Sequence, residues 1–349
     1  MFPLRTRRRN TGIFQKSTLL RQHFSWSIAR WQAGDNTMQI ARDILLHSYR
    51  SMRTIREFEE RLHTEFATGE IPGFVHLYCG EEASAVGVCA HLGESDTIAS
   101  THRGHGHCIA KGVEVEGMMA EIYGRSTGVC RGKGGSMHIA DLARGMLGAN
   151  GIVGGGPPLI CGAALSHKLL KTDGVAVAFY GDGASNEGTT LESLNLASVW
   201  KLPAVFVCED NGYGEATGAS YACAGTQKDR AAGFGMPYFE CDGTDFFAVY
   251  ETAGEAIAYA RSGKGPVMLH VHLARWYGHF EGDAMSYRAS DEVAQQRMNM
   301  TASAVFALAP RGRVCWMAQA SMISTALCVA GSMPPCRPPR QPPCPNRKT

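Results

Sequence analysis

The chain has 349 residues and a formal net charge of +2, so its overall charge does not favour binding to nucleic acid. Hydrophobic residues make up 44% of the sequence and charged residues 19%, which is typical of a globular protein with a sizeable buried core. The 12 cysteines include no Cys-x-x-Cys pair, and most lie inside apolar runs. We therefore expect buried, reduced thiols and a cytoplasmic location.

Residues 1–37 contain a single acidic residue, Asp35, against six arginines and one lysine. This composition predicts a disordered basic leader, and it is typical of an organelle transit peptide. A mitochondrial matrix location is the alternative that such a leader implies. A further alternative is that Met38 is the true start and that the leader is an upstream extension.

The middle of the chain alternates between helical and strand patterns. Apolar residues recur at helical spacing in three segments: residues 38–63, 186–200 and 246–263. Three short apolar runs have the character of buried parallel strands: residues 174–180, 203–210 and 266–274. This order predicts an α/β domain over residues 38–297, built as a doubly wound parallel sheet flanked by helices. In such sheets, ligands bind at the carboxyl ends of the strands.

The stretch AFYGDGASNEG, residues 178–188, runs from a predicted strand into a carboxylate between two glycines. Taken alone, it is also explained by a tight strand-to-helix turn with a capping Asp182. However, Asn211 follows the next predicted strand, so its amide oxygen and the Asp182 carboxylate are expected side by side. Such hard oxygen ligands suit Mg²⁺. Gly183 and Ala184 lead into a predicted helix start, whose free N–H groups can hold phosphate.

These features, taken together, resemble a thiamine diphosphate signature, and the resemblance extends from about Met38 to Arg288. Over that span the chain is similar to the alpha subunits of the thiamine-dependent first component of 2-oxo acid dehydrogenase complexes. The motifs occur in the family's order: GKGGSMH, GANGIVGGGPPL, YGDGASNEG, EDNGYG and WYGH. The likeness is closest to acetoin and pyruvate dehydrogenase alpha subunits, and it implies the thiamin-diphosphate-binding fold.

The resemblance implies an oxidoreductase that cleaves acetoin, or decarboxylates pyruvate, and passes the acyl unit to a lipoyl-bearing transacylase. We favour acetoin because residues 68–88 and 100–112 look more like acetoin subunits. In pyruvate enzymes a Tyr often occupies the position of His102. The family's carboxylate that faces the aminopyrimidine ring belongs to the beta chain. The resemblance therefore implies an alpha2-beta2 heterotetramer whose active site is shared between two polypeptides.

The resemblance also assigns roles to matching positions. Asp182, the Asn211 side chain and the Tyr213 carbonyl would bind Mg²⁺, and the amides of Gly183 and Ala184 would contact the diphosphate. Catalytic roles would fall to two imidazoles, His76 and His279. The same two histidines, together with the Arg103 guanidinium, would face the diphosphate or the reacting centre. The remaining cofactor-binding positions are His102, Ala143, Gly151 and Val153.

Different classes of site remain alternatives. THRGHGHC places His102, His105, His107 and Cys108 within one short stretch, which would suit a zinc-binding protein. No second half of a Cys/His cluster accompanies it, and a phosphate-facing loop also accounts for the arginine within the stretch. The GANGIVGGG stretch does not open a helix after a strand, so nicotinamide binding is not expected.

Other acidic and imidazole residues have simpler interpretations. His270 and His272 lie in an apolar strand and are expected to be core residues with hydrogen-bond partners. Glu81 and Glu82 are expected to begin a helix, where acidic residues are favourable, and not to act as catalytic acids.

The end of the chain differs from the family. Past Glu292 there is no acidic residue, and residues 334–345 are rich in Pro, Arg and Cys. We expect the segment 298–349 to be disordered, and a shifted reading frame would explain its composition. In that case the chain is a damaged, inactive copy that keeps its cofactor motifs. The apolar run 314–330 is short for a membrane span and contains Gln319, so no membrane association is expected.

Overall fold

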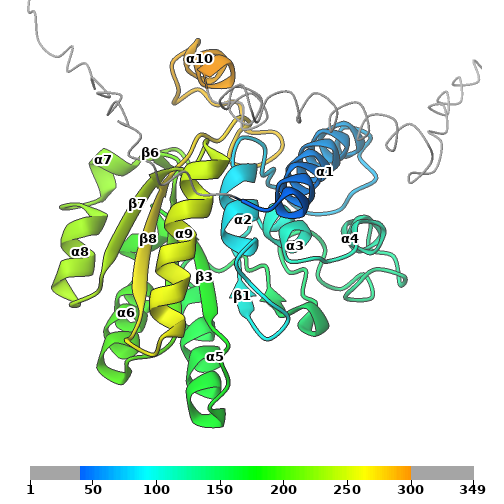
Figure 1. Ribbon diagram of the computed structural model, residues 1–349. Helices are drawn as coiled ribbons and strands as arrows, with labels where there is room; N and C mark the ends of the chain where they lie inside the picture. Colours follow the sequence, from blue (N-terminus) through cyan, green and yellow to red (C-terminus); the bar gives the residue numbers. More distant parts are fainter. Residues whose placement is uncertain (1–39, 300–349) are drawn as a thin grey trace, which may run out of the picture. The chain divides into compact units, whose positions relative to one another are not determined.

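Residues 40–299 are described by a computed structural model, which begins with the long helix α1 and ends with α10 (Figure 1). The predictions for the leader 1–37, for the start at Met38 and for the tail, with its frameshift and the apolar run 314–330, concern residues outside this range. From Ala41 onward the described residues belong to one compact unit. Within residues 40–299, no helix combines the length and apolar character that crossing a membrane requires.

Six parallel strands form the central sheet, in the order β2-β1-β3-β4-β8-β7. Their bounds are β1 Thr97–Ala99, β2 Met146–Gly148, β3 Ala176–Gly181, β4 Ala204–Asp210, β7 Tyr238–Asp242 and β8 Val267–His272. Strand β2 pairs with one edge of β1, whereas β3 pairs with the other edge of β1 and is followed by β4. The strand order therefore reverses between β1 and β3, which is where ligands bind in doubly wound sheets.

Ten α-helices and a short ribbon surround the sheet in the described part of the chain. The helices are α1 Arg42–Phe66, α2 Glu82–Cys89, α3 His105–Ala110, α4 Val115–Ile122, α5 Gly156–Leu170, α6 Gly188–Trp200, α7 Ala219–Ala222, α8 Gln227–Gly233, α9 Phe246–Arg261 and α10 Glu292–Asn299. Two 3-10 turns, η1 Leu142–Arg144 and η2 Ala184–Asn186, interrupt the loops. The ribbon pairs β5 Tyr213–Gly214 with β6 Thr217–Gly218.

The two faces of the sheet are covered by different helices, because side chains along a strand alternate between faces. On one face, Ala178 and Phe206 pack with residues of α5, α6 and α8. On the other face, α9 lies against β7 and β8 and also packs on α2 (Figure 1). There Phe179 stacks on His107 of α3, with ring centroids 3.9 Å apart. The helices on both faces confirm the doubly wound architecture.

The predicted strands and helices of the middle of the chain are confirmed with small shifts at their ends. Residues 174–180, for example, correspond to β3, and residues 246–263 correspond to α9. The expectation of buried, unpaired cysteines is also met in the described residues, where eight thiols are free and six of them are buried. Cys130 and Cys223 are partly exposed.

We predict that Gly87→Ala destabilises the fold by roughly 1–3 kcal/mol, because the interface between α2 and α9 has no room for a methyl group. A Cβ at Gly87 would lie 2.6 Å from Val249 Cγ1 and 3.2 Å from the backbone nitrogen of Tyr250. Gly162→Ala in α5 is the matched control, since a Cβ there meets nothing within 4 Å. That variant should gain roughly 0.5–1 kcal/mol from helix propensity. Urea unfolding would measure both, and equal effects would contradict this account of the packing.

Candidate functional site

A pocket of about 290 Å³ opens at the carboxyl edge of the sheet. Its walls come from the segments that follow β1, β3 and β4 and from the loop that leads into α5. Because β1 and β3 are the strands between which the chain order reverses, the pocket lies where the topology favours a ligand. Five of the predicted cofactor residues that line it lie in the segments after β3 and β4: Asp182, Gly183, Ala184, Asn211 and Tyr213.

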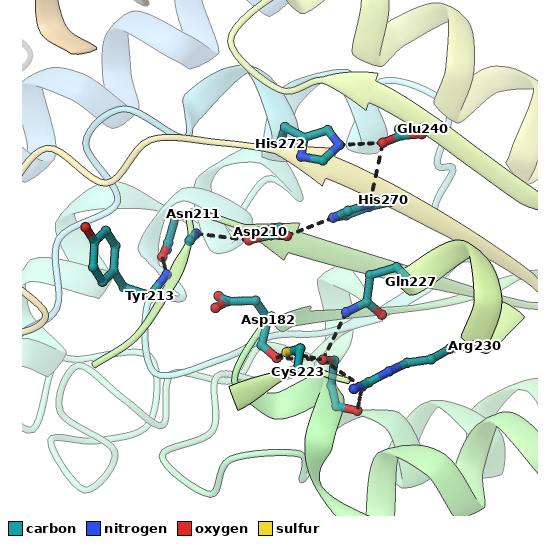
Figure 2. A network of polar contacts seen from close by, with 12 residues as sticks. Asp182, Asp210, Asn211, Tyr213, Cys223, Gln227, Arg230, Glu240, His270 and His272 are labelled. Atoms are coloured by element: carbon teal, nitrogen blue, oxygen red, sulfur yellow. Dashed lines mark hydrogen bonds and ion pairs between the residues drawn. The ribbon is translucent and has the colours of Figure 1, made fainter. Parts of the chain in front are cut away.

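Asp182 follows β3 directly, and only 2% of its surface is exposed. Its Oδ2 atom is buried and has no hydrogen-bond partner. Burial, reinforced by the charge of Asp210, raises the pKa of Asp182 to about 6. The carboxylate points toward the side on which Asn211 and Tyr213 lie (Figure 2). Leaving a buried carboxylate oxygen unpaired is costly, so this atom is well suited to receive a cation.

Asn211 stands at the end of the neighbouring strand, as predicted, because β3 and β4 pair in parallel with Gly181 opposite Glu209. Its Nδ2 donates to Glu81 Oε1 at 3.0 Å. This hydrogen bond fixes the orientation of the amide, with Oδ1 as its acceptor atom. The backbone nitrogen of Tyr213 donates to that oxygen at 3.3 Å. The structure therefore holds an amide oxygen and a carboxylate at adjacent strand ends.

Glu81 is a site residue that the sequence did not reveal. It precedes α2 as expected for a helix start, but its side chain is buried and contacts Asn211 rather than the helix. Burial raises its pKa to about 7, against the opposing charge of Arg103. The adjacent Glu82 is the structural residue, since it accepts from the Gly80 amide and pairs with Arg56. Two neighbouring glutamates thus have different roles, which only their tertiary contacts distinguish.

The turn after Asp182 differs from the expected helix start. Ala184 opens the 3-10 turn η2, and α6 begins only at Gly188. Gly183 and Ala184 nevertheless line the pocket. The backbones of the turns after β3 and β4 approach closely there, because a Cβ at Gly183 would lie 3.2 Å from Gly214 Cα. Glycine at these positions lets the two turns share one wall of the pocket.

Three histidines form a cluster beside the pocket. The ring centroids of His76 and His102 are 4.6 Å apart, and His279 lies within 5.0 Å of each. Burial and the charge of Arg103 lower the pKa of His76 to about 2 and that of His279 to about 4. The pKa of His102 falls well below its usual value for the same reasons. All three imidazoles are therefore neutral at pH 7.

Two buried arginines bring positive charge to the pocket wall, which also contains the carboxyl groups of Asp182, Glu187 and Glu215. Arg103 lines the pocket. Two of its guanidinium donors are already used, because they donate to the carbonyls of Leu77 and His279. Burial lowers the pKa of Arg103 to about 10. Arg275, which the sequence analysis missed, also lines the pocket and contacts His279 Nδ1 at 3.3 Å. Its other nitrogen donates to the Tyr287 hydroxyl at 2.7 Å. The combination suits a ligand with several negative charges.

The remaining predicted cofactor positions are distributed unevenly. Val153 lines the pocket, and Gly151 lies two positions before it on an exposed loop. Ala143 is not brought to the site: it is exposed in η1, outside the lining residues. The side chain of Asp141 caps that turn by accepting from the Arg144 amide, which holds it as a separate surface feature. The cofactor role of Ala143 stays a prediction.

The four ligands of the zinc alternative do not converge. His102 faces the pocket, whereas His105 contacts Glu59 and Ser136, with its Nε2 2.9 Å from the serine oxygen. The ring of His107 is held elsewhere, at 2.8 Å from Ser100 Oγ and 3.2 Å from a buried carboxylate. His105, His107 and Cys108 lie in helix α3, whereas His102 precedes the helix. Zinc binding by these four residues is not supported.

Comparison with known proteins yields one family and a set of clear relatives. The dehydrogenase E1 component family matches residues 50–309. The alpha subunit of acetoin:2,6-dichlorophenolindophenol oxidoreductase from Cupriavidus necator is 60% identical over 272 residues, covering 78% of this chain and 82% of that protein. The Bacillus subtilis protein of the same name is 59% identical, covering 73% and 77%. The pyruvate dehydrogenase E1 component subunit alpha from Rhizobium meliloti is 41% identical, covering 76% of each.

We predict that Asp182→Asn raises the free energy of unfolding at pH 7 in the presence of a chelator, by roughly 1–3 kcal/mol. The pKa of Asp182 in the folded protein, about 6, exceeds the ordinary value of 3.8. Its ionised form therefore destabilises the fold at pH values above about 6. The gain should shrink toward zero as the pH falls to about 4, where the wild-type carboxyl is protonated.

The control is Asp96→Asn, since Asp96 pairs with Arg261 at 2.8 Å and has a pKa below its ordinary value despite its burial. That variant should lose stability at pH 7. Chemical denaturation at two pH values measures both variants. A loss of stability in Asp182→Asn that does not change with pH would refute the electrostatic account.

Proposed function

This chain belongs to the dehydrogenase E1 component family of thiamine-diphosphate-dependent oxidoreductases acting on oxo groups, and we propose that it is the alpha subunit of an acetoin-cleaving member. The higher identity to the two acetoin enzymes than to the pyruvate enzymes supports this substrate. Pyruvate is the second candidate, supported by the relatives at lower identity. The acyl unit would pass to a lipoyl group on a transacylase partner.

The observation that carries the proposal is the buried, unpartnered Oδ2 atom of Asp182 in the wall of a pocket that two arginines also line. An oxygen atom of this kind fits Mg²⁺, and the amide oxygen of Asn211 adds a second hard donor from the adjacent strand end. With the Tyr213 carbonyl as a third, these residues would hold the metal. Gly183 and Ala184 would offer backbone amides to a diphosphate, and the charges of Arg103 and Arg275 would balance it.

Thiamine diphosphate, when bound, supplies an electron sink for cleavage of the bond beside a carbonyl carbon. The chain's own residues would position the substrate and move protons. Cleavage of acetoin next to its hydroxyl group requires that the hydroxyl proton be removed, and neutral His279 and His102 in the pocket wall are candidates to accept it. Burial and the charge of Arg103 lower their pKa values. A polyanion bound beside them would raise these pKa values toward 7, because it favours the protonated imidazole.

The proposal includes a second polypeptide. The relatives are named as alpha subunits, which supports a beta subunit partner for this chain. That partner would supply the carboxylate for the aminopyrimidine ring, in an alpha2-beta2 assembly. The partly exposed loop with Ile152 and Val153, 72% and 50% accessible, lies at the pocket and is suited to such a contact.

The test of substrate class is an assay of the chain with its beta subunit, using a dye as electron acceptor. We expect kcat/KM for acetoin to exceed that for pyruvate by at least about tenfold, a difference of roughly 1.4 kcal/mol in transition-state binding. His102→Tyr should lower this ratio, because the variant places a phenol where the imidazole lines the pocket. His47→Tyr, on an exposed position of α1, is the control. A preference for pyruvate would reverse the assignment.

We predict that metal-dependent binding of thiamine diphosphate weakens as the pH falls below about 6, because the Asp182 pKa of about 6 means that a proton competes with Mg²⁺. The apparent affinity for Mg²⁺ should fall by about tenfold per pH unit below that value if one proton is displaced. Asp182→Asn should lose binding and its pH dependence, and Asn211→Ala should lose binding.

Calorimetry on the assembled subunits measures these affinities. Glu57→Gln, an exposed position on α1 that pairs with Arg53, serves as the control and should leave them unchanged. Retention of full affinity in both Asp182→Asn and Asn211→Ala would show that the metal is held elsewhere.

A further inference from the structure

A second polar cluster lies at the carboxyl edge of the sheet, on strands β4, β8 and β7 (Figure 2). Parallel pairing sets Asp210 opposite His272 and Glu240 opposite His270. Because alternate residues of a strand share a face, the four side chains come to the same face of the sheet. From their place in an apolar strand, both histidines are expected to be core residues. His270 is indeed buried, but His272 is partly exposed.

The donor atoms of this cluster converge. His270 Nε2 lies 3.0 Å from Asp210 Oδ2, and His272 Nε2 lies 2.6 Å from Glu240 Oε1. His270 Nδ1 lies 3.9 Å from that same glutamate oxygen. One potential ligand atom each from Asp210, His270 and His272 falls within 4.8 Å of the other two. The two imidazole centroids are 4.2 Å apart.

We propose that His270, His272 and Asp210 form a binding site for a borderline divalent transition-metal ion, of which Zn²⁺ is the representative. Glu240, which contacts His272 Nε2, is a supporting partner of that imidazole. Zinc binds imidazole nitrogen and carboxylate oxygen at about 2.0–2.2 Å, usually with four ligands. The three ligand atoms already lie within 4.8 Å of one another, so one ion could be shared among them. The Asp210 carboxylate also offsets part of the charge of a divalent cation.

The surroundings of His270 favour metal ligation. Its Nδ1 lies 2.9 Å from the Tyr238 hydroxyl oxygen. That oxygen can accept a hydrogen bond from Nδ1 when Nδ1 carries the proton. With the proton held there, the lone pair of Nε2 faces Asp210 and the interior of the cluster. Metal-bound histidines typically donate their second ring nitrogen in this way, which fixes the tautomer and the ring orientation. Tyr238 is thus a supporting partner of the site.

Charge distinguishes this cluster from the three histidines beside the pocket. His76, His102 and His279 lie close to Arg103 and Arg275, whose charges oppose a bound cation and favour an anion. The second cluster instead pairs its imidazoles with carboxylates. It differs also from the oxygen donors of the turn after β3, which suit Mg²⁺. Ligand chemistry would therefore direct the two ions to different places.

The two places are adjacent along the chain. Asp210 directly precedes Asn211, and its Oδ1 accepts from the Gly212 amide at 2.9 Å. An ion held by the Asp210 carboxylate would steady the turn that carries the asparagine. The site itself rests on the geometry of β4, β8 and β7 and does not depend on the proposed reaction.

The test is zinc binding by the full-length chain after removal of metals with a chelator. Competition with a chromophoric chelator gives the affinity, and X-ray absorption gives the ligand atoms. We expect about one zinc ion per chain, with only nitrogen and oxygen ligands near 2.0–2.2 Å. His272→Gln and Glu240→Gln, both at partly exposed side chains, should weaken binding by at least about tenfold, and Tyr238→Phe by about tenfold.

Two controls make the outcome decisive. His63→Gln removes a partly exposed histidine that also pairs with a carboxylate, Glu281 at 2.8 Å, but lacks a second imidazole, so binding should not change. His102→Gln tests the cluster beside the pocket and should also leave binding unchanged. Loss of zinc in His102→Gln with retention in His272→Gln would overturn the proposal. Sulfur ligands at about 2.3 Å, or no zinc bound to the wild-type chain, would overturn it as well.

Discussion

The parallel, in-register pairing of β3, β4 and β8 determines which side chains meet at the carboxyl edge of the sheet. Gly181 lies opposite Glu209 in one pair, and Asp210 lies opposite His272 in the next. A shift of one residue in either pair would turn every side chain of the strand to the other face. The unpartnered carboxylate of Asp182, the amide beside it and the histidine pair on β8 all follow from this register.

The pocket concentrates charge that the fold on its own would avoid. Asp182 and Glu81 are buried carboxyl groups with pKa values raised by burial to about 6 and about 7. Arg103 is buried nearby, and burial lowers its pKa. Groups with such perturbed pKa values cluster where proteins bind or transform ligands. Burying these charged groups lowers the stability of the fold. The sheet below them, with apolar residues packed on both faces, offsets this loss.

The sequence predicted the part of the fold that depends on periodic patterns. The long helix α1, the helix α9 and the apolar strands β3, β4 and β8 were anticipated because each has a clear local signal. Strands β1 and β2 were missed because three residues are too few to show an alternation. The other site residues depend on tertiary contacts, which no local sequence pattern reveals. Glu81 and Arg275 reach the site through such contacts, and Ala143 lies in the capped turn η1, outside the pocket lining.

The thiols of the described residues differ in their accessibility to chemical reagents. Cys208, under the site in β4, is fully buried, and its pKa is raised well above the usual value by burial, so it stays protonated and inert. Cys223 is partly exposed, and its sulfur accepts from Asn186 Nδ2 at 3.1 Å, beside the turn that follows Asp182. A fluorescent or spin label attached to Cys223, in a variant that lacks Cys130, would therefore lie beside that turn and report on its environment.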